Sequence, residues 1–97
     1  MKYISLINWT DQGIKNVKDS AKRLDAGRKL AKKFGCTVGD AYLTIGPYDM
    51  VVMIEAPDDE TATAMMLQVS ALGNVHTHTA RAFTAAEMDK ILAKKGS

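Results

Sequence analysis

The order of apolar and polar residues along the chain predicts four strands separated by helices. Strands are expected at residues 3–9, 37–45, 50–56 and 75–83, where β-branched, aromatic and other apolar residues gather. Apolar residues at helical spacing follow from residue 14 to Phe34 and again from residue 62 to Leu72. A short terminal helix is expected after Thr84. The chain therefore reads strand–helix–strand–strand–helix–strand, followed by one more helix.

Start and stop signals set the bounds of these elements. Residues 10–13 end the first strand with turn and cap chemistry, and a short helical turn is expected over residues 11–18. Asp19 or Ser20 is the expected N-cap of the main helix, which Gly35 ends. Pro57 marks the start of the second helix, and the residues that follow it are acidic. Thr84 and Glu87 have the spacing of a capping box, so the terminal helix has a defined start.

Residues 46–49, Gly-Pro-Tyr-Asp, form the turn between the two middle strands. Proline presets one backbone angle, and glycine and aspartate tolerate turn geometry. Two β-α-β halves joined by this hairpin predict an α+β fold, the ferredoxin-like βαββαβ sandwich with a short C-terminal helix. Right-handed crossovers give an antiparallel sheet of strand order 4-1-3-2, with both main helices on one face. The length of 97 residues predicts one domain over residues 1–97.

Alternate residues of a strand point to opposite sides of the sheet, so the pattern also predicts which side chains the helices cover. We expect the covered set to be Ile4, Leu6, Ala41, Leu43, Ile45, Val75 and Phe83. The helix-free face is then expected to carry Tyr3, Ile7, Trp9, Tyr42, Val51, Met53, His76 and His78. A patch this apolar usually marks an interface or a ligand groove. We therefore predict that a second copy packs sheet to sheet, closing a dimeric α/β barrel with a cavity between the copies.

Composition narrows the classes of protein. Hydrophobic residues at 46%, charged residues at 25% and a net charge of +2 are typical of a soluble globular protein. Neither a concentrated basic face with stacking aromatics nor a membrane-length apolar run is present, so we expect no nucleic acid and no membrane partner. The N-terminus shows no targeting segment. Cys36 is the only cysteine and is expected to be a buried residue at a strand start, which favours the reducing cytoplasm.

Four stretches of sequence resemble one family of small bacterial proteins. They are the GPYD turn, the following strand that ends in EAPDDE, NWTDQGIKNVKDSAKR near the start, and ALGNVHTHTARAFTAAEM near the end. Together they resemble the GYD-domain family over essentially the whole chain, with Gly46, Tyr48 and Asp49 at the positions of the naming motif. That family is similar to the dimeric α/β-barrel group, which includes cofactor-free monooxygenases, haem-handling proteins, decarboxylases and effector-binding domains. The resemblance implies the fold and leaves the chemistry open.

Two pairs of residues are candidates for chemistry. Tyr48 and Asp49 either stabilise the hairpin turn or orient a polar ligand at a cavity mouth. His76 and His78 share one face of a strand and are the candidate catalytic residues for general acid–base work. They also lie within reach of one metal ion, but a third ligand would have to come from Asp40, Glu55 or a second subunit. Two histidines alone are weak evidence, so we expect no metal site.

Aromatic and basic residues supply the remaining candidates. Trp9 and Tyr42, with Tyr3 beside them, are expected to pack in an interface or to line a ligand groove. Arg23 and Arg81 are expected either to pair with acidic residues or to hold an anionic ligand. The sequence identifies no cofactor.

Two function hypotheses follow. The first is a homo-oligomeric small-molecule-binding or structural protein, because no strong catalytic constellation is visible in the sequence. The second is a small dimeric-barrel enzyme, of the cofactor-free monooxygenase or isomerase type, acting on an apolar or aromatic substrate. It requires Trp9, Tyr42, His76 and His78 to converge on one cavity. Whether the chain is a structural partner of a larger enzyme stays open.

Overall fold

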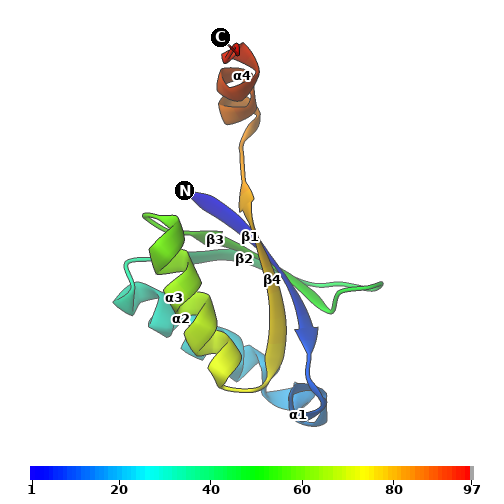
Figure 1. The fold of residues 1–97 in the computed structure, drawn as a ribbon. Coiled ribbons are helices and arrows are strands. Elements are labelled where there is room, and N and C mark those ends of the chain that lie inside the picture. Colours follow the sequence, from blue (N-terminus) through cyan, green and yellow to red (C-terminus); the bar gives the residue numbers. More distant parts are fainter. Residues whose placement is uncertain (97) are drawn as a thin grey trace.

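The computed structural model describes residues 1–96 and shows a four-stranded sheet with two long helices on one face (Figure 1). The strands are β1 (Lys2–Trp9), β2 (Thr37–Leu43), β3 (Met50–Glu55) and β4 (Val75–Ala82). Their order in the sheet is β2-β3-β1-β4, and every neighbouring pair is antiparallel. The predicted α+β class and strand order are therefore confirmed.

The helices begin and end close to the predicted residues. They are α1 (Asp11–Lys15), the short 3₁₀ turn η1 (Val17–Asp19), α2 (Ser20–Lys33), α3 (Asp59–Ala71) and α4 (Ala85–Ala93). Gly35 follows α2 with a φ of 70°, a conformation that glycine adopts without strain. Thr84 and Glu87 form both halves of the predicted capping box. Within residues 1–96, no helix has the length and apolar character needed to cross a bilayer.

The core lies between the sheet and helices α2 and α3. It is built from Tyr3, Ile7, Ala31, Cys36, Val52, Ile54, Ala56, Ala62, Met65 and Met66. Ser5 is also fully buried there, and its hydroxyl oxygen accepts a hydrogen bond of 2.9 Å from the Thr79 hydroxyl. Because this polar group has a partner, its burial leaves no unsatisfied atom. Cys36 is buried at the start of β2, as its position in the sequence predicted.

The predicted faces of β1 are reversed in the structure. Tyr3, Ser5 and Ile7 are buried under the helices, so Ile4 and Leu6 point to the opposite side of the sheet. Both sets of alternate positions in β1 contain large apolar residues, and the alternation therefore did not distinguish them. The buried position suits Tyr3 because its hydroxyl reaches the Asp59 carboxylate at the start of α3, 2.5 Å away.

Three residues predicted to lie under the helices are exposed instead. Leu43 and Ile45 lie at the end of β2 and in the hairpin beyond it, and are 75% and 105% exposed. Phe83 follows β4 and is 54% exposed. Figure 1 shows why, since the β2–β3 hairpin tip and the segment after β4 both extend past the helical layer.

Helix α4 stands apart from the sheet and from the other helices (Figure 1). The molecule consequently measures 53 × 31 × 20 Å, with a radius of gyration of 14.9 Å where a compact chain of this length would have about 12.5 Å. One stripe of α4 is apolar and open to solvent: Met88 is 51%, Ile91 45% and Leu92 71% exposed. The arrangement leaves an amphipathic helix without a packing partner among residues 1–96.

Candidate functional site

The side of the sheet that the helices do not cover carries a continuous apolar surface, which we call the open face. Its residues are Ile4, Leu6, Tyr42, Val51, Met53 and Ala80. Tyr42, Val51 and Leu6 are cross-strand partners in one row, and Met53, Ile4 and Ala80 form the next row. Side chains opposite each other in such rows are in contact range. Tyr42 is 53% and Met53 37% exposed, so the centre of the open face is in contact with solvent.

Polar residues border the open face at both ends. At one end, the Lys2 ammonium and the Glu55 carboxylate form an ion pair of 2.6 Å between β1 and β3. At the other end, His78 lies beside Leu6 and His76 beside Asn8, as expected for outward-facing positions of β4. The Tyr48 ring approaches the His78 ring edge-on, with centroids 5.9 Å apart and planes at 65°. The open face is therefore an apolar centre with polar margins, which is typical of protein interfaces.

Asp49 is held by the backbone of the hairpin. Its carboxylate accepts a hydrogen bond of 2.9 Å from the Trp9 backbone N–H, and its own N–H donates to the Ile7 carbonyl at 2.9 Å. Its carbonyl also accepts from the Thr44 N–H. These bonds tie the GPYD turn to the end of β1. These are the contacts expected of a residue that stabilises a turn.

The predicted ligand-binding residues lie in three separate places. Tyr42 and Tyr48 belong to the open face and its margin, while Trp9 lies on the covered side, among the residues that line the space under α2 and α3. Arg81 lies at the far end of β4, where its guanidinium pairs with the Glu87 carboxylate at 3.5 Å. The structure of one chain therefore brings Tyr48 and His78 together and separates both from Trp9 and Arg81.

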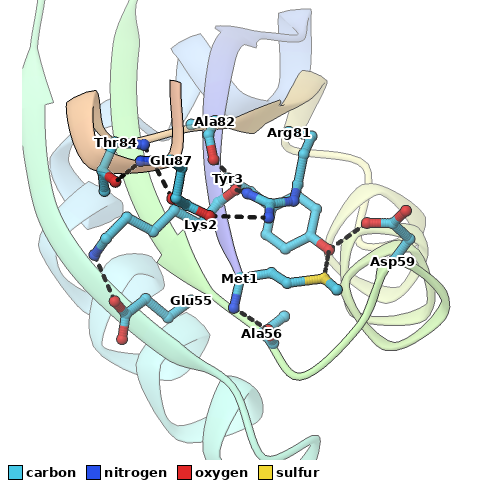
Figure 2. A network of polar contacts seen from close by, with 10 residues as sticks. All are labelled: Met1, Lys2, Tyr3, Glu55, Ala56, Asp59, Arg81, Ala82, Thr84 and Glu87. Carbon is cyan, nitrogen blue, oxygen red and sulfur yellow. Dashed lines mark hydrogen bonds and ion pairs between the residues drawn. The ribbon is translucent and has the colours of Figure 1, made fainter. Parts of the chain in front are cut away.

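Arg81 belongs to a polar network that joins the start of α4 to the sheet (Figure 2). Its guanidinium donates hydrogen bonds to the carbonyls of Lys2 and Ala82 and lies over the Tyr3 ring, 5.8 Å from the centroid. It also lies 4.4 Å from the centroid of Phe83. The guanidinium is attracted by the faces of both rings and by the Glu87 carboxylate, and these attractions stabilise its position. These contacts fix the direction in which the chain leaves β4.

Tyr3 and Asp59 form the other half of this network (Figure 2). The hydrogen bond that the Tyr3 hydroxyl donates to the Asp59 carboxylate raises the pKa of the phenol to about 12, and burial adds to the effect. Because the pKa lies above the unfolded value of 10.0, the bond stabilises the fold below pH 10. That contribution is lost as the pH rises from 10 to about 12.

We expect an alkaline titration, followed by phenolate absorbance, to show one tyrosine ionising near pH 12 that is missing in a Tyr3→Phe variant. Replacing Asp59 by Asn removes the negative acceptor and should bring the pKa of Tyr3 down towards 10.0. A titration curve that Asp59→Asn leaves unchanged would show that the bond to the carboxylate does not set this pKa.

A cavity on the covered side contains residues that the sequence did not single out as functional, among them Ser5 and Gly27. An isolated glycine within a helical pattern was the one available signal, at Gly27. Among residues 1–96, no three His, Cys, Asp or Glu side chains gather closely enough to hold a metal ion.

Known proteins resemble this chain over most of its length. Residues 3–92 match the GYD domain. A Thermus thermophilus protein named glutamine synthetase and cystathionine beta-lyase binding protein is 32% identical over 87 residues, which are 89% of this chain and 92% of that protein. The crystal structure of TTHA0845, also from Thermus thermophilus, is similar in fold, with a TM-score of 0.55 and 24% identity, covering 87% of this chain and 94% of that one. The chain belongs to the GYD domain family.

Proposed function

We propose that this protein is a homo-oligomeric binding protein without a catalytic centre, which self-associates through the open face. Two ferredoxin-like chains would pack sheet to sheet and form the dimeric α/β barrel that the family resemblance implied. The observation that carries the proposal is the apolar centre of the open face, where Tyr42, Met53 and their row partners contact solvent. The buried free thiol of Cys36 supports a reducing cytoplasm as its location.

The area of exposed surface supports association. The chain exposes 6791 Å², whereas a compact monomer of 10.6 kDa exposes about 5,500 Å². The difference between these two exposed areas is larger than the roughly 800 Å² that each partner buries in a standard interface. A second copy would therefore cover surface that a lone chain leaves in contact with water.

Helix α4 supplies a second reason. A helix of 9 residues is marginal in water by itself, and α4 exposes Met88, Ile91 and Leu92 on one stripe. Packing against another copy would bury this stripe and stabilise the helix. The network around Arg81 holds the start of α4 in a fixed direction, and a partner on the apolar stripe would stabilise the rest of the helix.

Light scattering tests the proposal directly. At micromolar concentration the wild-type protein should be a dimer or larger, and Met53→Asp should be a monomer, because the carboxylate would be buried without a partner. The matched control is Leu67→Asp on α3, where the leucine is 66% exposed and lies outside the open face. It should leave the assembly unchanged. A monomeric wild-type protein would overturn the proposal.

The named relative extends the proposal to other proteins. Because that relative is called a binding protein for glutamine synthetase and cystathionine beta-lyase, we propose that this chain also binds an enzyme. The test is co-elution of the purified chain with each of these two enzymes from its own organism. Wild type should retain at least one of them, and retention of neither would remove this extension while leaving self-association standing.

The enzyme hypothesis receives less support from the geometry. It required Trp9, Tyr42, His76 and His78 to line one cavity, but Trp9 lies on the covered side of the sheet and the other three on the open side. The edge-on contact between the Tyr48 and His78 rings favours it, because it places a phenol and an imidazole at the same margin of the sheet. The geometry supports binding better than catalysis.

A further inference from the structure

A second apolar site lies on the covered side of the sheet. A half-open cavity of about 390 Å³ lies between the sheet and helices α2 and α3. Its walls are mainly aliphatic, with Ile7, Val52 and Ile54 from the sheet and Leu24, Leu30 and Met66 from the helices. Leu72 also lines it and is 66% exposed, so the cavity reaches solvent at that end. This site is separated from the open face by the sheet itself.

The size of the cavity fits a small organic molecule. Ligand pockets usually measure about 300–1,000 Å³ and are mostly apolar. An apolar cavity of about 150 Å³ accommodates one benzene, so this one has room for roughly 12–16 non-hydrogen atoms. The void is thus large enough to be occupied by a ligand.

Gly27 leaves part of the cavity unfilled because it has no side chain. It lies in the middle of α2, where glycine costs about 1 kcal/mol relative to alanine. A Cβ atom built on Gly27 would meet nothing within 4 Å, although the residue lines the cavity. The helix therefore has space for a side chain here and carries none, which keeps that part of the cavity free.

One cation lies at the rim of the cavity. The Arg23 guanidinium donates to the carbonyls of Asn16 at 2.8 Å and Gly13 at 3.2 Å, and to the Ser20 hydroxyl at 3.2 Å. All three acceptors are neutral. Within the described residues 1–96, no carboxylate lies within 4 Å of Arg23, whereas Arg81 pairs with Glu87. Arg23 consequently keeps a positive charge that an anion at the rim would compensate.

We propose that this cavity binds an amphipathic anion, an aliphatic monocarboxylate of medium chain length. The hydrocarbon chain lies among the aliphatic walls, and the carboxylate lies at the rim and pairs with Arg23. Decanoate, with twelve non-hydrogen atoms, matches the available space. The proposal does not rest on self-association, because the site lies on the other side of the sheet from the open face.

Trp9 makes the test direct, since it lines the cavity and is the chain's one tryptophan. Titrating decanoate below its micelle concentration into the full-length protein should change the Trp9 fluorescence saturably, with one ligand per chain. Decan-1-ol is the uncharged comparison. Arg23→Gln should weaken decanoate binding about tenfold or more and leave decanol binding unchanged, because only the carboxylate uses the charge. Arg23→Lys should keep most of the decanoate affinity.

Two further variants locate the site. Gly27→Leu fills the open space and should abolish the binding of both ligands, while its thermal unfolding shows that the fold persists. Met53→Asp alters the open face and should bind both ligands as the wild type does. Unsaturable fluorescence in the wild type, or full binding by Gly27→Leu, would overturn the cavity as the site. Equal losses of decanoate and decanol in Arg23→Gln would overturn the preference for an anion.

Discussion

Met65→Ala is expected to lower the free energy of unfolding by about 3 kcal/mol. Met65 is 2% exposed and is the largest fully buried side chain, packed from α3 against the sheet. Truncating a buried methionine removes apolar burial and leaves a void, and such changes cost about 2–5 kcal/mol. The void would join the cavity beside it, because Met65 lines that cavity too. Urea denaturation followed by circular dichroism measures the change.

Leu67→Ala is the matched control on the same helix. Leu67 is 66% exposed, so its truncation should change the free energy of unfolding by less than about 0.5 kcal/mol. Equal effects of the two substitutions would contradict the position of α3 on the sheet, because they would mean that both faces of the helix are buried to the same extent.

Gly13→Ala is expected to cost about 1–3 kcal/mol. A Cβ atom on Gly13 would lie 1.9 Å from the Asn74 carbonyl oxygen and 2.9 Å from its carbonyl carbon, so backbone would have to move. Thr10 binds the same turn twice, through its N–H to the Asn74 carbonyl at 3.1 Å and through its hydroxyl to the Gly73 carbonyl at 2.6 Å. Separating α1 from this turn would weaken both bonds.

Gly27→Ala provides the comparison, measured by the same urea denaturation. It replaces another helical glycine, at a position where a Cβ meets nothing, and should stabilise the protein by about 0.5–1 kcal/mol. If Gly13→Ala also stabilised the protein, α1 would not be packed against residues 73–74 as the structure describes.

Helix and turn positions could be predicted from the sequence because their signals are local. Strand order followed because right-handed crossovers in two β-α-β halves allow few arrangements. Thr84 and Glu87 sit three residues apart and form their capping box within one turn. The GPYD turn likewise ends one strand and starts the next within a few residues. Such features depend on neighbours in the chain, so the sequence alone contains the information needed to place them.

The faces of β1 could not be predicted because they depend on distant contacts. Ile4 and Ile7 are equally apolar, and the two faces differ in contacts such as the hydrogen bond that Asp59 accepts from the Tyr3 hydroxyl, 56 residues away in the sequence. The distinction between Arg23 and Arg81 has the same origin. Arg81 forms an ion pair with Glu87, which follows it closely in the sequence. Arg23 donates hydrogen bonds to neutral acceptors, the carbonyls of Asn16 and Gly13. Side-chain partners of this kind follow from tertiary structure.

The pairing of β1 has a consequence for the making of the protein. This strand leaves the ribosome before both of its partners, which come much later in the chain: Lys2 pairs with Glu55 in β3 and with Ala82 in β4. Until β4 has left the ribosome and paired, one side of β1 has free backbone groups next to an apolar surface, the kind of edge that recruits other chains. A delay in the release of β4 would prolong this state and should lower the yield of folded protein.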